Sequence, residues 1–308
     1  MSKKVLVATS KPFAKEAVES ISEIIKKAGY QLILLESYTD PADLVKAVAD
    51  VDALIVRSDL VTPDVIAAAK NLKIVVRAGA GFDNIDLKAA TDHGVVVMNT
   101  PGQNSNAVAE LVFGLMLNLA RRAYTGKSGT ELKGKKLGIH AYGNVGVNVS
   151  RIAGGFGMDV YAYDPFIPKK TMEDAGVHPV DSPEELYETC HYVSVHLPKM
   201  KETLGVVNFD LMSRMPREAC VINTARKEVV DEPSLLKMME ERKDFLYGAD
   251  VAPDCQAEMK EKFGIRCSFT DKKMGAQTEE ANINAGIAAI NQIIGFFEKN
   301  DTTFQVNK

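Results

Sequence analysis

Two glycines and an acid near the middle of the chain have the spacing that binds a dinucleotide. An apolar segment ending at Ile139 leads into the turn 141–146, Ala-Tyr-Gly-Asn-Val-Gly, and a second apolar segment ends at Asp164. Gly143 lets the backbone approach a pyrophosphate, and Gly146 lets a helix pack closely on the preceding strand. The free N–H groups at the start of that helix would then receive the anion.

Asp164 indicates which dinucleotide the turn would bind. It lies 18 residues after Gly146, near the offset at which a carboxylate meets the ribose hydroxyls of adenosine. A carboxylate repels a 2′-phosphate, so we expect NAD rather than NADP. Ala141 departs from the glycine pattern, and an ordinary tight turn between a strand and a helix is the alternative.

Three arginines follow apolar segments and could bind an acidic substrate. Arg226 comes shortly after segment 219–223, and Arg57 and Arg77 end two earlier segments. Guanidinium binds carboxylate or phosphate bidentately and keeps its charge. A small carboxylic acid needs about one such cation, whereas a phosphorylated acid benefits from several. Structural ion pairs are the alternative role of these arginines.

Alternating strands and helices must position these residues. The strands expected in the first hundred residues are 5–8, 32–35, 53–56, 74–76 and 95–98. The helices expected there are 13–27, 41–49 after an Asp40 cap, 63–70 after Thr62, and 87–93. Each strand is too uniformly apolar to face water on one side, which predicts a parallel sheet covered by helices.

The glycine turn opens a second unit of the same kind. Its further strands are expected at 159–163, 192–196, 219–223 and 247–251, and a long helix at 279–299. We therefore expect an α/β protein with two doubly wound parallel sheets and a cleft between them. Residues 1–100 and 283–308 would form one discontinuous domain, and residues 101–282 the other. Alternatively, the last helix closes the second domain.

The composition argues against several classes of function. A net charge of −4 and a sequence pI near 5.8 do not suit nucleic-acid binding. The four cysteines lack metal-site spacing and disulfide density, so we expect reduced thiols and no metal. No segment approaches the about 20 apolar residues of a membrane span. The N-terminus lacks a signal peptide, so we expect a cytoplasmic protein without membrane contact.

Several motifs in a fixed order resemble the D-isomer-specific 2-hydroxyacid dehydrogenases over nearly the whole chain. They are Arg77-Ala-Gly79-Ala-Gly81-Phe-Asp83-Asn84, Asn99-Thr-Pro-Gly-Gln-Asn104-Ser105, His196-Leu-Pro198, and Asn223-Thr-Ala-Arg226 followed by Asp231-Glu232. The resemblance is strongest to members that oxidise D-3-phosphoglycerate, the first step of serine biosynthesis. It implies a flavodoxin-like substrate domain, a Rossmann NAD domain, and a homodimer formed through the NAD domains.

The resemblance also implies roles for individual residues. Arg226 would clamp the substrate carboxylate while NAD accepts the hydride. The residues expected at the cofactor are Gly143, Asn144, Val145, Gly146, Asp164, His196, Pro198, Thr224, Ala225 and Asp250. Those expected at the phosphorylated 2-hydroxy acid are Arg57, Ser58, Arg77, Ala78, Gly79, Asn104, Arg226 and Lys273. Asp250 matches a position that contacts the nicotinamide amide, with a strand-end cap as the alternative.

The proton donor departs from the family pattern. Lys273 occupies the position of the catalytic histidine, and all five histidines precede residue 197. We predict that Lys273, or its neighbour Lys272, is the acid/base and that burial beside Arg226 lowers its pKa. Solvated loop lysines are the alternative. Asp254 is a further catalytic candidate, one residue before Cys255, which occupies the position of the family's supporting glutamate.

Two other functions fit the same motifs. A reductase of glyoxylate, hydroxypyruvate or another D-2-hydroxyacid partner would use the carboxylate clamp without a phosphate. A non-catalytic scaffold that senses NAD(H) would keep the glycine turn and could lose the histidine, but it needs no carboxylate clamp. The chain stops after one family unit, so feedback by serine through a regulatory extension is not expected.

Overall fold

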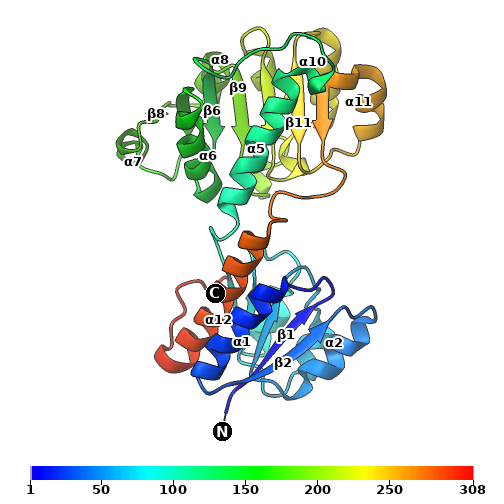
Figure 1. The fold of residues 1–308 in the computed structure, drawn as a ribbon, viewed down its shortest axis with the longest axis vertical. Coiled ribbons are helices and arrows are strands. Elements are labelled where there is room, and N and C mark those ends of the chain that lie inside the picture. The colour runs from blue at the N-terminus through cyan, green and yellow to red at the C-terminus, as the bar shows by residue number, and fades with distance from the viewer. Residues whose placement is uncertain (1, 308) are drawn as a thin grey trace. The chain divides into compact units, whose positions relative to one another are not determined.

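The computed structural model describes residues 2–307, which form two compact units. Unit 1 contains the described residues up to Asn104 and those from Gln277 onward, and unit 2 contains Ser105–Ala276. Each unit is built on a parallel sheet (Figure 1). The expectation of two doubly wound parallel sheets is therefore confirmed. The boundaries between the units lie a few residues from the expected 100/101 and 282/283.

Unit 1 has a five-stranded sheet in the order β2-β1-β3-β4-β5. Its strands are β1 (Lys4–Thr9), β2 (Gln31–Glu36), β3 (Ala53–Val56), β4 (Ile74–Arg77) and β5 (Val96–Asn99). Its helices are α1 (Lys15–Lys27), α2 (Pro41–Ala47), η1 (Val48–Asp50), α3 (Pro63–Ala68), α4 (Leu87–Asp92) and α12 (Glu279–Lys299). The strand order reverses between β1 and β3, a flavodoxin-like switch point at which α/β sheets bind ligands.

Strand β2 differs from the expected buried strand. Leu34 at its centre is 43% exposed, whereas every residue of β3 is buried. Since β2 is at the edge of the sheet, neighbouring elements cover it less completely than they cover a central strand. The prediction that all five strands are buried on both faces is therefore wrong for β2.

The two ends of the chain share the core of unit 1. Helix α12 lies beside α1 (Figure 1), and a Cβ placed on Gly286 would be only 2.8 Å from Ile21 Cδ1. The last described residues pair with β5, because Val306 N–H donates to Val97 O at 2.9 Å. Asn307 continues the pairing, accepting from Val97 N–H and donating to Val95 O, each at 2.8 Å. The open edge of β5 is thereby covered.

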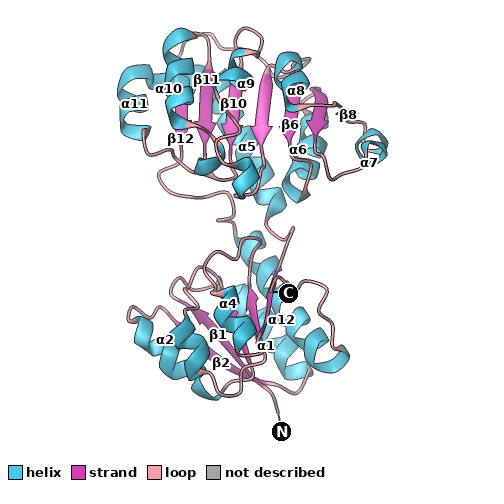
Figure 2. Cartoon of the chain, turned by 180° about the vertical axis from the view of Figure 1, so that it is seen from behind, coloured by secondary structure: helices cyan, strands magenta, loops and turns pink. Residues whose placement is uncertain are grey.

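Unit 2 has a seven-stranded sheet in the order β12-β11-β10-β9-β6-β7-β8, with helices on both faces (Figure 2). Its strands are β6 (Lys136–His140), β7 (Asp159–Tyr163), β8 (His178–Pro179), β9 (Tyr192–Val195), β10 (Cys220–Asn223), β11 (Leu246–Ala249) and β12 (Cys267–Phe269). Its α-helices are α5 (Ser105–Ala120), α6 (Asn144–Gly155), α7 (Lys169–Asp174), α8 (Pro183–Thr189), α9 (Phe209–Ser213), α10 (Glu232–Glu241) and α11 (Gln256–Phe263). Its 3₁₀ turns are η2 (Arg122–Tyr124), η3 (Lys201–Thr203), η4 (Lys227–Val229) and η5 (Gly264–Arg266).

Several elements of unit 2, among them α5, β8 and β12, were not expected from the sequence. Helix α5 is apolar around much of its circumference because it is buried against the sheet, so its residues show little periodicity. Strands β8 and β12 have two and three residues, too few for a recognisable pattern. The strand order of unit 2 reverses between β6 and β9, and the glycine turn follows β6.

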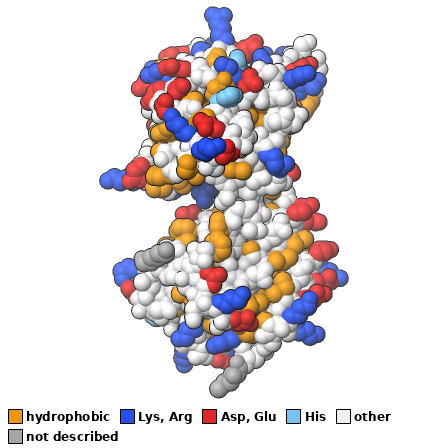
Figure 3. Space-filling view, turned by 90° about the vertical axis from the view of Figure 1, so that its left-hand side faces the viewer, with side chains coloured by type: hydrophobic (Ala, Val, Ile, Leu, Met, Phe, Trp, Pro, Cys, Tyr) orange, Lys and Arg blue, Asp and Glu red, His pale blue; other side chains and the backbone are white. Residues whose placement is uncertain are grey.

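The surface carries charges of both signs. Figure 3 shows Lys and Arg side chains interspersed with Asp and Glu on the face in view. Among residues 2–307, no helix combines the length and apolar composition needed to cross a membrane. Within the same residues, no three His, Cys, Asp or Glu side chains are grouped as a metal site.

Candidate active site

The two glycines of the turn 141–146 are needed for different reasons. A Cβ on Gly146 would lie 2.7 Å from Ala141 O and 2.9 Å from Ile139 Cγ2, so helix α6 packs too closely on β6 for any side chain there. A Cβ on Gly143, the N-cap of α6, would meet no atom within 4 Å. Gly143 therefore leaves open space in front of the helix N-terminus, where an anion is stabilised.

Ala141 has the backbone conformation of a glycine. Its φ is +80°, and its N–H donates to Tyr163 O at 2.9 Å. An L-residue in the left-handed region costs about 1–2 kcal/mol. The departure from the glycine pattern thus leaves the turn intact at the expense of local strain.

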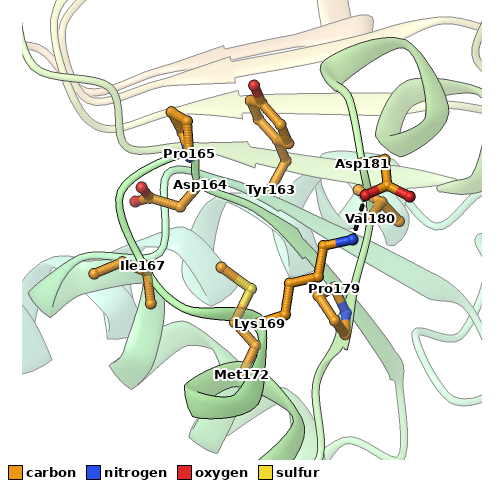
Figure 4. Close-up of a pocket in the computed structure, with 9 residues that line it drawn as sticks. All are labelled: Tyr163, Asp164, Pro165, Ile167, Lys169, Met172, Pro179, Val180 and Asp181. Carbon is orange, nitrogen blue, oxygen red and sulfur yellow. Dashed lines mark hydrogen bonds and ion pairs between the residues drawn. The ribbon is translucent and has the colours of Figure 1, made fainter.

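Asp164 ties the turn to the end of β7. Its Oδ2 accepts from Tyr142 N–H at 2.8 Å, and its Oδ1 accepts from Phe166 N–H at 2.9 Å. Asp164 is one of the residues that line a cavity of about 230 Å³, and the ion-paired Lys169 and Asp181 line it as well (Figure 4). Each carboxylate oxygen retains a lone pair that could accept from a ribose hydroxyl.

His196 follows β9, next to the glycine turn across the switch point. Its backbone N–H donates to His140 O at 2.9 Å, and its Nε2 lies 2.9 Å from Ser194 Oγ. Burial, together with repulsion from His140, lowers the pKa of His196 to about 3. The ring is therefore neutral near pH 7, which excludes it as a cationic substrate clamp. Pro198, two residues further on, is exposed.

The strand end of β10 carries Thr224, Ala225 and Arg226. Buried Asn223 organises them, because its Nδ2 donates to Arg226 O at 2.8 Å and its Oδ1 accepts from Ala225 N–H at 3.0 Å. Arg226 is half-buried, and its Nη1 donates to Ala225 O at 2.9 Å. Thr224 Oγ1 is buried without a hydrogen-bond partner among the described residues.

Asp250 follows β11 and binds the loop that carries Lys273. Its Oδ1 accepts from Met274 N–H at 2.6 Å, and its Oδ2 accepts from Gly275 N–H at 2.8 Å. Lys273 itself is exposed. The prediction of a buried Lys273 is therefore wrong, because the loop after β12 runs along the surface of unit 2.

Asp254 is engaged in an ion pair with Lys227, and this contact raises the pKa of the lysine. Its carboxylate is exposed. Glu232 orders the backbone here, since its two oxygens accept from Asp254 N–H at 2.8 Å and Cys255 N–H at 3.0 Å. Burial, followed by the charge of Glu232, raises the pKa of Cys255 to about 12, so this thiol is not an ionised nucleophile.

In unit 1, Arg57 lies at the switch point between β1 and β3. Its guanidinium donates to Lys11 O and Pro12 O, each at 3.3 Å, and to Asn282 Oδ1 on α12. It also lies over the ring of Phe13, 5.1 Å from the centroid, and burial lowers its pKa. Part of its hydrogen-bonding capacity therefore serves the protein.

Arg77 ends the neighbouring strand, β4. Its Nε donates to Arg57 O at 2.9 Å, which links the two strand ends. A Cβ on Gly79 would lie 1.5 Å from Arg77 Nη1, so the guanidinium rests directly on the glycine backbone. Ala78 is buried between these two residues. Ser58 is exposed after β3, and Asn104 is half-buried after β5.

The residues of unit 2 fit a bound dinucleotide. Open space before α6, Asp164 at a cavity, and the unpartnered Thr224 hydroxyl all lie at the carboxyl ends of parallel strands. Residues 143–146 and Asp164 would hold the pyrophosphate and the adenosine ribose. Thr224 would gain the hydrogen bond that its buried oxygen lacks.

Sequence reasoning missed the residues that support the site. Asn223 and Glu232 were named only as parts of motifs, without a role, and Asn282 was not named. The hydrogen-bond partners of Asn282 and Glu232 lie far along the chain, whereas those of Asn223 are two and three residues away. Asn223 had one signal, because a polar residue ending an apolar strand must satisfy its hydrogen bonds locally.

Comparison with known proteins identifies relatives over the whole chain. The profile of the family described as D-isomer specific 2-hydroxyacid dehydrogenase, catalytic domain, matches residues 6–307. A crystal structure of NAD+-bound 3-phosphoglycerate dehydrogenase in Entamoeba histolytica superposes with a TM-score of 0.90 and 45% identity, covering 100% of this chain and 99% of that one.

Two curated relatives differ in length and in name. D-3-phosphoglycerate dehydrogenase of Methanocaldococcus jannaschii is 35% identical over 82% of this chain, which spans about half (51%) of that relative. Hydroxypyruvate reductase of Thermotoga maritima is 34% identical over 93% of this chain and 96% of its own length.

Proposed function

The chain belongs to the D-isomer-specific 2-hydroxyacid dehydrogenase family, and we propose that it oxidises D-3-phosphoglycerate to 3-phosphohydroxypyruvate, the first step of serine biosynthesis. The observation that carries the proposal is that Arg226 and the Lys273 loop follow the carboxyl ends of strands β10 and β12, at the same side of the sheet of unit 2 as the glycine turn after β6. The 45% identity to the Entamoeba histolytica enzyme supports it.

NAD, when bound, supplies the acceptor for the hydride that leaves C2 of the substrate. Arg226 would hold the substrate carboxylate bidentately. Lys273, as a neutral amine, would take the proton of the C2 hydroxyl as the carbonyl forms, and the lysinium would return it in the reverse direction. Oxidation should therefore weaken as the pH is lowered, because protonation of the amine removes the proton acceptor.

Arg57 and Arg77 would bind the phosphate of the substrate. Arg77 Nε donates to Arg57 O, and Arg77 Nη1 rests against the backbone of Gly79. Arg57 directly follows β3 and Arg77 ends β4, so both side chains start from the carboxyl ends of adjacent parallel strands in unit 1. Paired guanidinium groups suit a dianionic phosphate better than an uncharged substituent.

The test is NADH formation from D-3-phosphoglycerate at mildly alkaline pH with the keto acid trapped. We expect turnover in the wild type, and losses of roughly 100-fold or more in Arg226→Ala and Lys273→Ala. Lys260→Ala is the matched control, since it removes an exposed lysine of α11 that has no place in the site and should retain activity. Absence of wild-type turnover despite NADH binding would overturn the proposal.

Reduction of hydroxypyruvate is the second candidate, because the Thermotoga maritima relative of that name matches over 96% of its length. Kinetics of Arg77→Ala with phosphorylated and unphosphorylated keto acids would separate the two. We expect a loss confined to the phosphorylated substrate. Equal losses for both would favour the unphosphorylated one.

The proposal includes a homodimer that forms through unit 2, as the family resemblance implies. Sedimentation of the purified chain would give twice the monomer mass of 33.5 kDa. A monomeric mass at micromolar concentration would contradict this part of the proposal without affecting the chemistry.

A further inference from the structure

The carboxylate of Asp250 accepts hydrogen bonds from the loop 270–275. It is 1% exposed and accepts three side-chain or backbone donors, namely Thr270 Oγ1 at 3.0 Å, Met274 N–H at 2.6 Å and Gly275 N–H at 2.8 Å. Two carboxylate oxygens offer about four acceptor positions. Asp250 therefore commits most of its capacity to the residues on either side of Lys273.

The contact is too close to be incidental. A Cβ on Gly275 would lie 2.9 Å from Asp250 Oδ2 and 3.3 Å from Val108 Cγ2, so only glycine lets the backbone reach the carboxylate. The single hydroxyl proton of Thr270 is shared between Asp250 Oδ1 and Asp250 O, which lies 2.8 Å from Thr270 Oγ1. Residues on both sides of Lys273 are thus anchored to Asp250, Thr270 through its hydroxyl and Met274 and Gly275 through their backbone N–H groups.

A continuous hydrogen-bonded path joins this anchor to Arg226. Asp250 N–H donates to Asn223 O at 3.1 Å, and Asn223 Nδ2 donates to Arg226 O at 2.8 Å. Asn223 ends β10 and Asp250 follows β11, adjacent parallel strands of the rigid core of unit 2. The backbone segments that carry Arg226 and Lys273 are therefore hydrogen-bonded to residues at the ends of the same two strands.

We propose that Asp250 is a positioning residue that holds the Lys273 loop, and that Asn223 holds Arg226 in the same way, so that the two strand ends set the separation of the proton acceptor and the carboxylate clamp. This rests on the proposed function. It differs from the role expected for Asp250, which is direct contact with the nicotinamide amide.

Asp250→Asn is the decisive variant, because it keeps the volume but turns an NH₂ group toward backbone donors. One hydrogen bond to Met274 or Gly275 is lost, and the loop moves. A displacement on the order of 1 Å can cost about 100-fold in rate, so we expect kcat with the hydroxy acid to fall roughly 10- to 100-fold. The Kd for NADH should change less than about threefold.

A double-mutant cycle with Lys273→Ala tests whether Asp250 acts through the lysine. We expect Asp250→Asn/Lys273→Ala to be no slower than Lys273→Ala alone. If the fold-loss in kcat of the double variant equals the product of the two single losses, the positioning role is overturned in favour of the nicotinamide contact. A large rise in the Kd for NADH in Asp250→Asn would overturn it in the same way. Asp210→Asn, at an exposed acid of α9, is the matched control.

Hydrogen exchange provides a readout that does not depend on activity. The amides of Met274 and Gly275 should be protected in the wild type and should exchange faster in Asp250→Asn, with peptides from β10 and β11 unchanged. Equal exchange in both would overturn the proposal. Gly275→Ala perturbs the same contact from the loop side and should accelerate exchange if Asp250→Asn does not fold. If Lys273→Ala keeps full turnover, the proposed acid/base fails, but the exchange result still decides whether Asp250 anchors the loop.

Discussion

At the scale of single residues, the turn after β6 has an alanine, Ala141, in a left-handed backbone conformation that glycine normally adopts. Ala141 keeps a φ of +80° because its N–H is bound to Tyr163 O and its carbonyl faces Gly146. The surrounding contacts over-determine a conformation that alanine disfavours. The strain is local, so its removal should stabilise unit 2 without altering the fold.

We expect Ala141→Gly to raise the free energy of unfolding by about 0.5–1 kcal/mol. Relief of about 1–2 kcal/mol of left-handed strain is partly offset by the greater entropy of glycine in the unfolded chain. Urea denaturation measures the change. Ala257→Gly, at an exposed position of α11, is the control and should lose about 0.5–1 kcal/mol. A loss at both positions would show that Ala141 is unstrained.

The two glycines of the turn should respond differently to alanine. Gly143→Ala adds a methyl group to open space, so its stability should stay within about 0.5 kcal/mol of the wild type. The same methyl group would occupy the approach of the pyrophosphate, and NADH affinity should fall at least about tenfold.

Gly146→Ala would instead force α6 away from β6 and cost about 1–3 kcal/mol of stability. NADH fluorescence titration and urea denaturation of both variants separate the effects. Unchanged NADH affinity in a stably folded Gly143→Ala would mean that the pyrophosphate does not bind at this turn.

At the scale of elements, the two edge strands of the sheet of unit 1 differ in how they are covered. β2 remains an exposed edge, whereas β5 is covered by the last described residues, with Asn307 acting through its side chain on both sides of Val96. The amide also donates to Thr91 Oγ1 at 3.1 Å. The Asn307 side chain thus completes the hydrogen bonding between β5 and the last described residues.

We expect Asn307→Ala to destabilise unit 1 by about 1–3 kcal/mol, because Val97 N–H and Val95 O lose their partners in a buried place. Thermal unfolding followed by circular dichroism would show the loss. Asn291→Ala, at an exposed site on α12, should have almost no effect. Equal thermal midpoints for Asn307→Ala and the wild type would contradict the assignment.

At the scale of the whole molecule, His140 and His196 couple stability to pH. Burial lowers the pKa of His140 to about 4 and, with repulsion from His140, that of His196 to about 3, compared with 6.5 when unperturbed. The unfolded chain therefore binds protons below pH 6.5 that the folded chain does not. Stability is complete above this pH and decreases as the pH falls toward 4.

The free energy of unfolding should fall by up to about 1.4 kcal/mol per pH unit for each histidine between pH 6.5 and 5. Urea denaturation at several pH values gives the slope. His196→Asn removes one titrating group and should flatten it. A slope that is identical in this variant and the wild type would mean that His196 is protonated in the folded state.

The sequence by itself determined the features that depend on near neighbours. Apolar segments predicted the central strands, Asp40 and Thr62 cap their helices as expected, and the spacing of Gly143, Gly146 and Asp164 predicted the turn. In each case the interacting groups lie within a few residues, or within one strand-helix-strand unit. Residue propensity and spacing are therefore enough to predict these strands, caps and the turn.

Only the tertiary structure decided the features that join distant segments. It placed β2 at an edge, buried α5 against the sheet of unit 2, left Lys273 on the surface, and turned Asp250 toward a loop about 25 residues later. One hydrogen-bond partner of Arg57 lies 225 positions away, at Asn282. Such contacts are set by the packing of whole elements, and packing depends on which segments meet rather than on what any one segment prefers.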